Sequence, residues 1–280
     1  MTDKMAQHAP RYGRLLAGCL GMLVLTGGQA PALSAAEGAR NVELKFDIIA
    51  HGTRAYDLDI VYKLSPSDYR ATARAATTGL VGLFVDEELN MAAMGSLSSG
   101  RVRPANFRYS AREGSEKKTA QVSWDGGSVK VDRSFRMSRE REEDLNQAVD
   151  KSLPDPLSGI LAASMASGDK PCSGRQRVFD GKEVFELSFS YLGQETVKSA
   201  GAFEGPAHKC RVQYKSVAGL SKKRMAKNHS NPPVFTILFA TVEGPAGNLL
   251  VPVAGSGELK GKKVQIVARH AKVDGKPLGK

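Results

Sequence analysis

Residues 41–50 are NVELKFDIIA, and residues 56–64 are YDLDIVYKL. In both stretches apolar side chains alternate with polar ones. A period of two with one apolar face predicts a half-buried antiparallel strand for each stretch. The turn SPSD at residues 65–68 then predicts that residues 69–78 return as a third strand. These stretches place the chain in the all-β class and predict an antiparallel sheet.

The same pattern recurs along the chain around glycine-containing turns. Asp-Gly supplies the positive φ values of a two-residue type I′ turn, so each such site predicts a hairpin. Three more hairpins are expected, in which residues 121–124 and 128–132 flank Asp125-Gly126-Gly127, residues 176–179 and 182–191 flank Asp180-Gly181, and residues 248–254 and 262–273 flank Gly255-Ser256-Gly257 and Gly261.

One or two short helices interrupt the strands. Asp155 followed by Pro156 is typical of an N-cap and a first helical position. Apolar residues at helical spacing follow, and Gly168 ends the pattern. The apolar stretch Leu80–Leu89 is either a helix or a buried strand. Residues 138–151 are charged, which fits a solvated helix or a mobile loop, and residues 221–231 are expected to form an exposed basic loop.

The N-terminus has the pattern of an export signal. Residues 1–14 are polar and basic, residues 15–25 are apolar, and small residues lead to Ala36. The apolar run is too short to span a bilayer, which needs about 20 residues. We expect cleavage after Ala36, so that residues 1–36 are a signal peptide and residues 37–280 form a single β-rich periplasmic domain.

Two alternatives concern Cys19, which follows Leu16-Ala17-Gly18. This sequence resembles a lipoprotein-processing box, which would make Cys19 a lipidated anchor. The apolar run continues beyond Cys19, which favours a small apolar residue inside the signal peptide.

Two cysteines, Cys172 and Cys210, remain after the predicted cleavage. An even number of cysteines in an exported protein predicts a disulfide. Neither cysteine belongs to a paired Cys or Cys/His motif, so no metal site is predicted. We expect no cofactor.

The sequence offers no catalytic motif. It lacks a Gly-x-Ser-x-Gly elbow, a His-Glu-x-x-His motif and a phosphate-binding loop. Histidines 51, 208, 229 and 270 are scattered, so only folding would assemble a triad. Asp57 and Asp59 share one strand face, which is the usual spacing on the solvated side of a strand. The protein is therefore not expected to be an enzyme.

The formal net charge is +11. For an exported protein this favours anionic lipid head groups or acidic polymers over nucleic acid as counter-charges. The basic runs at residues 222–227 and 260–263 either contact an anionic membrane peripherally or are solvated loop charges, and we favour the second interpretation.

Apolar positions of the later strands supply either an ordinary filled core or the lining of a lipid pocket. A filled core is the simpler interpretation. The positions concerned are Phe185, Leu187, Phe189, Val234, Phe235, Ile237, Phe239, Leu249 and Val251.

Several short sequences carry a resemblance to a known family. In order, they are DPLS at residues 155–158, Cys172, VFDGK at 178–182, Cys210 with Val212, VAGL at 217–220 and VPV at 251–253. This ordered set resembles a family of exported bacterial proteins catalogued as domain of unknown function 3108. The resemblance implies an antiparallel β-barrel or β-spiral with the two cysteines bridged. Its plan is similar to lipoprotein-carrier half-barrels and to periplasmic envelope-integrity β-spirals, and it supplies no catalytic residues. Residues 138–151 and 221–231 depart from the family.

These observations predict a non-enzymatic, monomeric periplasmic protein that supports the cell envelope by binding an envelope protein. The alternative is a carrier that binds a lipid or a lipoprotein acyl chain in the barrel interior. A hydrolase acting on envelope polymers is less favoured.

Overall fold

The computed structural model describes residues 38–82, 85–165, 171–259 and 261–279. All of them belong to one compact unit, Ala36–Lys280. The predicted signal peptide, its cleavage site after Ala36, Cys19 and Gly168 lie outside the described residues.

The strands are long and occupy most of the described chain. Their bounds are β1 Arg40–Ala50, β2 Thr53–Leu64, β3 Asp68–Thr77, β4 Glu87–Ser98, β5 Arg101–Glu113, β6 Glu116–Asp125, β7 Ser128–Arg133, β8 Gly174–Phe179, β9 Val184–Ala200, β10 Phe203–Ala218, β11 Val234–Gly244, β12 Gly247–Leu259, β13 Lys262–Val273 and β14 Lys276–Pro277. The helices are α1 Gly79–Gly82, α2 Arg139–Ala148, α3 Pro156–Met165 and α4 Lys222–Ser230.

The described strands form one antiparallel sheet of 14 strands. Its order is β7-β6-β5-β4-β3-β2-β1-β13-β12-β11-β10-β9-β8, with β14 paired to β13. The mainly antiparallel β fold is thus confirmed. The sheet is not closed, because its order ends at β7 on one side and at β8 on the other.

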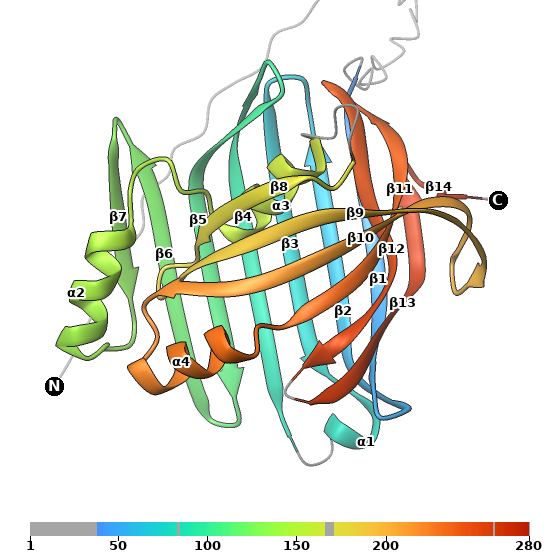
Figure 1. The fold of residues 1–280 in the computed structure, drawn as a ribbon. Coiled ribbons are helices and arrows are strands. Elements are labelled where there is room, and N and C mark those ends of the chain that lie inside the picture. The colour runs from blue at the N-terminus through green and yellow to red at the C-terminus, as the bar shows by residue number, and fades with distance from the viewer. Residues whose placement is uncertain (1–37, 83–84, 166–170, 260, 280) are drawn as a thin grey trace, which may run out of the picture. The chain divides into compact units, whose positions relative to one another are not determined.

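The sheet curls so that its two halves face each other. In Figure 1, β9 and β10 run across the front of β2–β5. Helix α3 lies between these layers, with contacts to β3, β4 and β5 on one side and to β8 and β12 on the other. The main core fills the space around α3 and includes Phe46, Tyr69, Phe107 and Leu161, each at most 2% exposed.

The first three strands follow the predicted pattern. Val42, Leu44 and Phe46 of β1 are buried, whereas the intervening polar side chains are not. Two-residue turns join several strands, and in the β1–β2 turn both His51 and Gly52 have positive φ. The predicted hairpin at residues 121–132 is confirmed, with Gly126 and Gly127 as its turn.

Two turn predictions are wrong. Residues 180–183 form a four-residue loop in place of a two-residue turn, because the Asp180 carboxylate accepts the backbone N–H groups of Lys182 and Glu183. Gly255 and Gly257 lie inside β12, not in a turn. A Cβ at Gly257 would meet the carbonyl oxygen of Val234 at 2.6 Å, so glycine there permits close strand approach.

The helices match the sequence in part. Helix α3 starts at Pro156, as predicted. The charged stretch before it contains α2, whose only buried residue is Leu145. Residues 221–231 were expected to form a loop, but Lys222–Ser230 form α4, a helix without buried residues. The stretch Leu80–Leu89 is neither one helix nor one strand, since α1 ends at Gly82 and β4 begins at Glu87. Among the described helices, none has the length and apolar composition needed to cross a membrane.

Candidate functional site

An apolar cavity of about 280 Å³ lies beside α3. Its walls come from β1 and β2, from α3, and from β9–β12. The lining residues are Val42, Leu44, Ile60, Tyr62, Leu157, Ile160, Leu161, Ser164, Leu187, Phe189, Val212, Ile237, Phe239, Leu249, Leu250, Val251 and Pro252. We call this space the apolar cavity.

The apolar cavity has a buried floor and a more exposed rim. Val42, Leu161 and Val251 on the floor are each about 2% exposed. At the rim, Leu187 and Phe189 of β9 are half-buried, and Ile160 of α3 is 36% exposed. The cavity therefore opens between α3 and the strand β9, where a ligand can enter.

The polar groups of the lining are satisfied within the protein. The Ser164 hydroxyl donates to the Ile160 carbonyl at 2.8 Å, and the Tyr62 hydroxyl donates to the Leu157 carbonyl at 3.2 Å. The cavity thus presents almost only hydrocarbon to its contents. Its volume is near the lower end of the range for small-molecule pockets, roughly 300–1,000 Å³. It suits a single alkyl chain better than a bulky polar ligand.

Six of the lining residues are among the apolar positions that the sequence assigned either to a filled core or to a pocket: Leu187, Phe189, Ile237, Phe239, Leu249 and Val251. Phe185, Val234 and Phe235 do not line the apolar cavity. The wall formed by β1, β2 and α3 was not anticipated. Its residues carry no distinctive signal, because alternating strand positions and helical apolar positions look alike whether they face a cavity or a packed core.

Helix α3 is fixed against the sheet by a buried polar cluster at its N-terminus. One carboxylate oxygen of Asp155, Oδ1, accepts the backbone N–H groups of Leu157 and Ser158, each at 3.0 Å. The other, Oδ2, accepts the Ser158 hydroxyl, which also contacts the Tyr69 hydroxyl. Burial raises the pKa of Asp155 to about 6, against these hydrogen bonds, which lower it. This cluster explains the sequence DPLS as an N-cap that positions one cavity wall.

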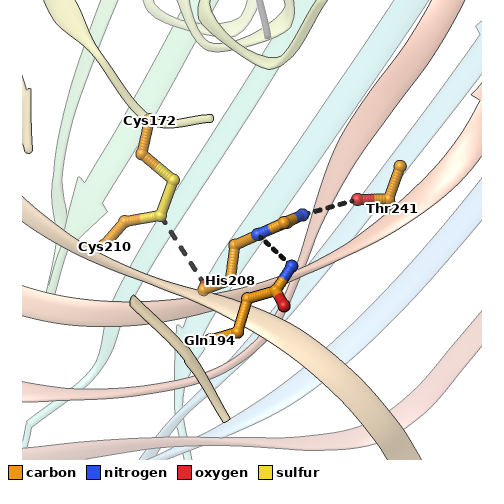
Figure 2. Close-up of a disulfide and its surroundings, with 5 residues drawn as sticks. All are labelled: Cys172, Gln194, His208, Cys210 and Thr241. Atoms are coloured by element: carbon orange, nitrogen blue, oxygen red, sulfur yellow. Dashed lines mark hydrogen bonds between the residues drawn. A yellow bond between two sulfur atoms is a disulfide. The ribbon is translucent and has the colours of Figure 1, made fainter. Parts of the chain in front are cut away.

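A disulfide lies behind the opposite wall. The structure joins Cys172 to Cys210, whose Cα atoms are 5.9 Å apart (Figure 2). The pair packs with Phe239 and Leu250, and Phe189 and Ile237 pack against the same cluster. All four of these apolar residues also line the apolar cavity. The disulfide therefore supports the β9–β12 wall and ties the chain that follows α3 to β10.

His208 stands beside the disulfide but points away from it. Its ring lies between Gln194 and Thr241 (Figure 2), with Nδ1 3.2 Å from Gln194 Nε2 and Nε2 3.1 Å from Thr241 Oγ1. The described residues contain no group of three His, Cys, Asp or Glu side chains arranged to hold a metal ion.

One convergence of serine, histidine and acid occurs near α4. The hydroxyl of Ser216 donates to the Glu183 carboxylate, and His229 Nε2 contacts the Ser216 carbonyl oxygen at 2.8 Å. Ser216 is fully buried. A triad needs the histidine beside the serine hydroxyl, and here the histidine meets the backbone of that residue. This cluster does not have the geometry of a nucleophilic site.

Asp57 and Asp59 lie on one face of β2, and Lys260 of the second predicted basic run lies outside the described residues. Asp57 joins Asp47, Arg54 and Arg269 in an ion-pair network. Asp59 is half-buried on the same face as Asp57. Surface networks of this kind contribute modestly to stability. In the basic run of α4, Lys222 pairs with Glu140 of α2 at 2.8 Å.

Comparisons with known proteins agree with this architecture. A β-barrel-like protein of the domain of unknown function DUF1849 from Brucella abortus has a similar crystal structure, with a TM-score of 0.50 and 9% sequence identity. The match covers 85% of this chain and 98% of that chain, and at this identity it shows the fold alone. Comparison with curated proteins gives no match. Residues 41–232 match the family described as "Protein of unknown function (DUF3108)". The matched segment runs from β1 to just beyond α4 and covers more than half of the chain. The chain therefore belongs to the DUF3108 family.

Proposed function

We propose that this protein is a non-enzymatic periplasmic carrier that binds the alkyl or acyl chain of a lipid or lipoprotein. The apolar cavity carries this proposal, because it is lined by hydrocarbon and opens beside α3. A buried apolar space that accepts no hydrogen bonds selects for ligands by shape and hydrophobicity. From the sequence alone, a filled core was the simpler interpretation of these apolar positions. The cavity among them favours the carrier role.

The position of the cavity supports a binding role over a catalytic one. Its lining contains no charged residue, and its serine and tyrosine hydroxyls are committed to backbone carbonyls. An activated nucleophile or a general base requires a titratable group beside the reacting atoms. The lining supplies binding energy and orientation without such a group.

Binding of dodecanoate, a single-chain amphiphile with an unsubstituted alkyl end, measured by isothermal titration, tests the proposal. Leu187→Trp adds a large side chain at the rim and should weaken binding by at least ten-fold. The matched control is Ser190→Trp, which adds the same side chain at an exposed position three residues along β9. It should bind as the wild type does. Equal affinity of all three proteins, or no binding by the wild type, would contradict a chain-binding cavity.

Native mass spectrometry of the protein purified gently from its own periplasm provides the second readout. A carrier should retain a stoichiometric adduct of lipid mass. Leu187→Trp should lose this adduct and Ser190→Trp should keep it.

A second candidate is support of envelope integrity through binding of an envelope protein. The observation that favours it is the open sheet, in which β7 pairs on one side only within the described residues. Such an edge accepts an added strand from a partner. Deletion of the gene should then reduce resistance to detergents and cell-wall antibiotics.

Complementation of the deletion strain distinguishes the two candidates. Leu187→Trp should fail to restore resistance if chain binding is the function, and should restore it if the β7 edge is used. Val131→Pro, which removes a backbone N–H from the side of β7 that pairs with no described strand, should behave in the opposite way. Thermal unfolding must first show that both variants fold. Normal resistance of the deletion strain would argue against both envelope roles.

A further inference from the structure

A second cavity of about 560 Å³ lies beside α4, between this helix, β10 and the start of β11. We call it the polar opening. Its polar and charged lining consists of Glu183, Tyr214, Arg224, Lys227, Asn228, Asn231 and Glu258. In contrast to the apolar cavity, it is bordered by charged and hydrogen-bonding groups.

The polar opening adjoins the apolar cavity. Leu187 of β9 lines the apolar cavity, and Tyr214 of β10 lines the polar opening. The two residues are directly paired across the strands, so their side chains share one face of the sheet. Phe185 lies next to them, with its ring centroid 4.9 Å from that of Tyr214. A ligand whose chain occupies the apolar cavity can therefore place its other end at the polar opening.

Helix α4 holds two cations over the polar opening. The helix is attached to β10 at its C-terminal end, where the Asn228 side chain accepts the backbone N–H of Ser216 at 2.7 Å and His229 contacts the Ser216 carbonyl. Arg224 and Lys227 line the opening and are exposed. Within the described residues neither has an ion-pair partner, whereas Lys222 of the same helix is paired with Glu140.

Of the two acidic residues in the lining, Glu183 is buried and does not offset these cations directly. Glu183 is 8% exposed and accepts the hydroxyl groups of Tyr214 and Ser216. Burial raises the pKa of Glu183, which favours its neutral form. Helix α4 itself carries four cations and no acidic residue. Glu258 also lines the opening and is exposed, so its one negative charge stands against the two positive charges of Arg224 and Lys227. The exposed lining therefore keeps a net positive charge, which suits an anion.

We propose that the ligand is a single-chain amphiphile with an anionic carboxylate or phosphate head, whose chain fills the apolar cavity and whose head binds Arg224 and Lys227. This inference rests on the proposed chain-binding function and adds the class of head group to it.

Three probes of equal chain length test the inference: dodecanoate and dodecyl phosphate, each below its micelle concentration, and dodecanol below its solubility limit. Isothermal titration at low salt should show tighter binding of at least one anionic probe than of dodecanol. The tighter anion identifies carboxylate or phosphate as the preferred head.

The variant Arg224→Gln/Lys227→Gln should weaken binding of the preferred anion by about five-fold, as expected for two exposed ion pairs. Its affinity for dodecanol should not change. The control Lys222→Gln/Lys223→Gln removes the same charge from the same helix away from the opening, and should bind all probes as the wild type does.

The outcomes separate the two proposals. Equal affinity for the anions and dodecanol, or an equal loss in both double variants, would overturn the anionic head site while leaving chain binding intact. Absence of binding for every probe, dodecanol included, would remove the proposed function itself.

Discussion

The hydroxyl of Tyr69 on β3 lies 2.5 Å from the hydroxyl of Ser158 in the first turn of α3, although 89 positions separate them in sequence. Both residues are fully buried. This contact, with the Asp155 carboxylate, determines where α3 stands between the two sheet layers. Since α3 forms one wall of the apolar cavity, the same contact helps to position that wall.

Asp155→Ala should reduce the free energy of unfolding by about 2–4 kcal/mol, because it removes an N-cap and leaves buried N–H groups without an acceptor. Urea denaturation measures the change. Ser138→Ala is the matched control, since Ser138 caps α2 without a side-chain hydrogen bond and its loss should cost little. A similar loss in both variants would contradict a special role for the Asp155 cap.

The free energy of unfolding should depend on pH because the Asp155 carboxyl is buried. Its pKa is raised from 3.8 to about 6, so between these values the folded state binds a proton that the unfolded state releases. The stability that this bound proton contributes is complete below pH 4 and is lost as the pH rises through 6. The resulting change in the free energy of unfolding is up to about 3 kcal/mol. The free energy of unfolding of the wild type, relative to Asp155→Asn, should therefore increase from pH 7 to pH 4.

Asp150 provides a control of opposite sign. The hydroxyl and backbone N–H of Ser152 hydrogen-bond to Asp150 and hold its pKa below its usual value. The stability it contributes is present above the unfolded pKa and is lost as the pH falls through the folded pKa. Relative to Asp150→Asn, the wild type should lose stability on acidification. Parallel pH profiles for the two comparisons would show that Asp155 is not perturbed by burial.

Loss of the disulfide should destabilise the protein by about 2–5 kcal/mol, as measured with Cys172→Ser/Cys210→Ser. The two residues are 38 apart in sequence, so the bond restricts a substantial loop in the unfolded chain. Protein purified and denatured without reductant should show no thiol labelling at Cys172 or Cys210. Labelling of either cysteine in that experiment would refute the bond.

Gly159→Ala should cost about 1–3 kcal/mol through overpacking. An added Cβ would clash with Cγ1 of Val178, which is fully buried on β8. Gly82→Ala is the control, because its Cβ would meet its nearest neighbour, the Thr77 carbonyl oxygen, at an ordinary 3.4 Å. Thermal denaturation of the pair measures how closely α3 must approach β8, and equal melting temperatures would contradict this close packing.

Local sequence patterns predicted the elements whose signals are local. The alternation in residues 41–50 produced β1, and Asp155-Pro156 marked the start of α3. The turn at Asp180 differs from the predicted one because the carboxylate of this residue accepts the backbone N–H groups of Lys182 and Glu183. The local patterns also missed α4, a polar helix with no buried residue whose position depends on contacts with Ser216 in β10.

The sequence by itself determined the strand pattern, the antiparallel class and the start of the helix α3, because these depend on side-chain periodicity and capping within a few residues. The sequence also predicted a disulfide between Cys172 and Cys210. Only the tertiary structure decided that the sheet stays open, and that Leu187 and Phe189 line a hollow instead of a filled core. Whether an apolar face meets another side chain or empty space depends on the distance between layers. That distance is set by contacts such as Tyr69 with Ser158, between residues far apart in the chain.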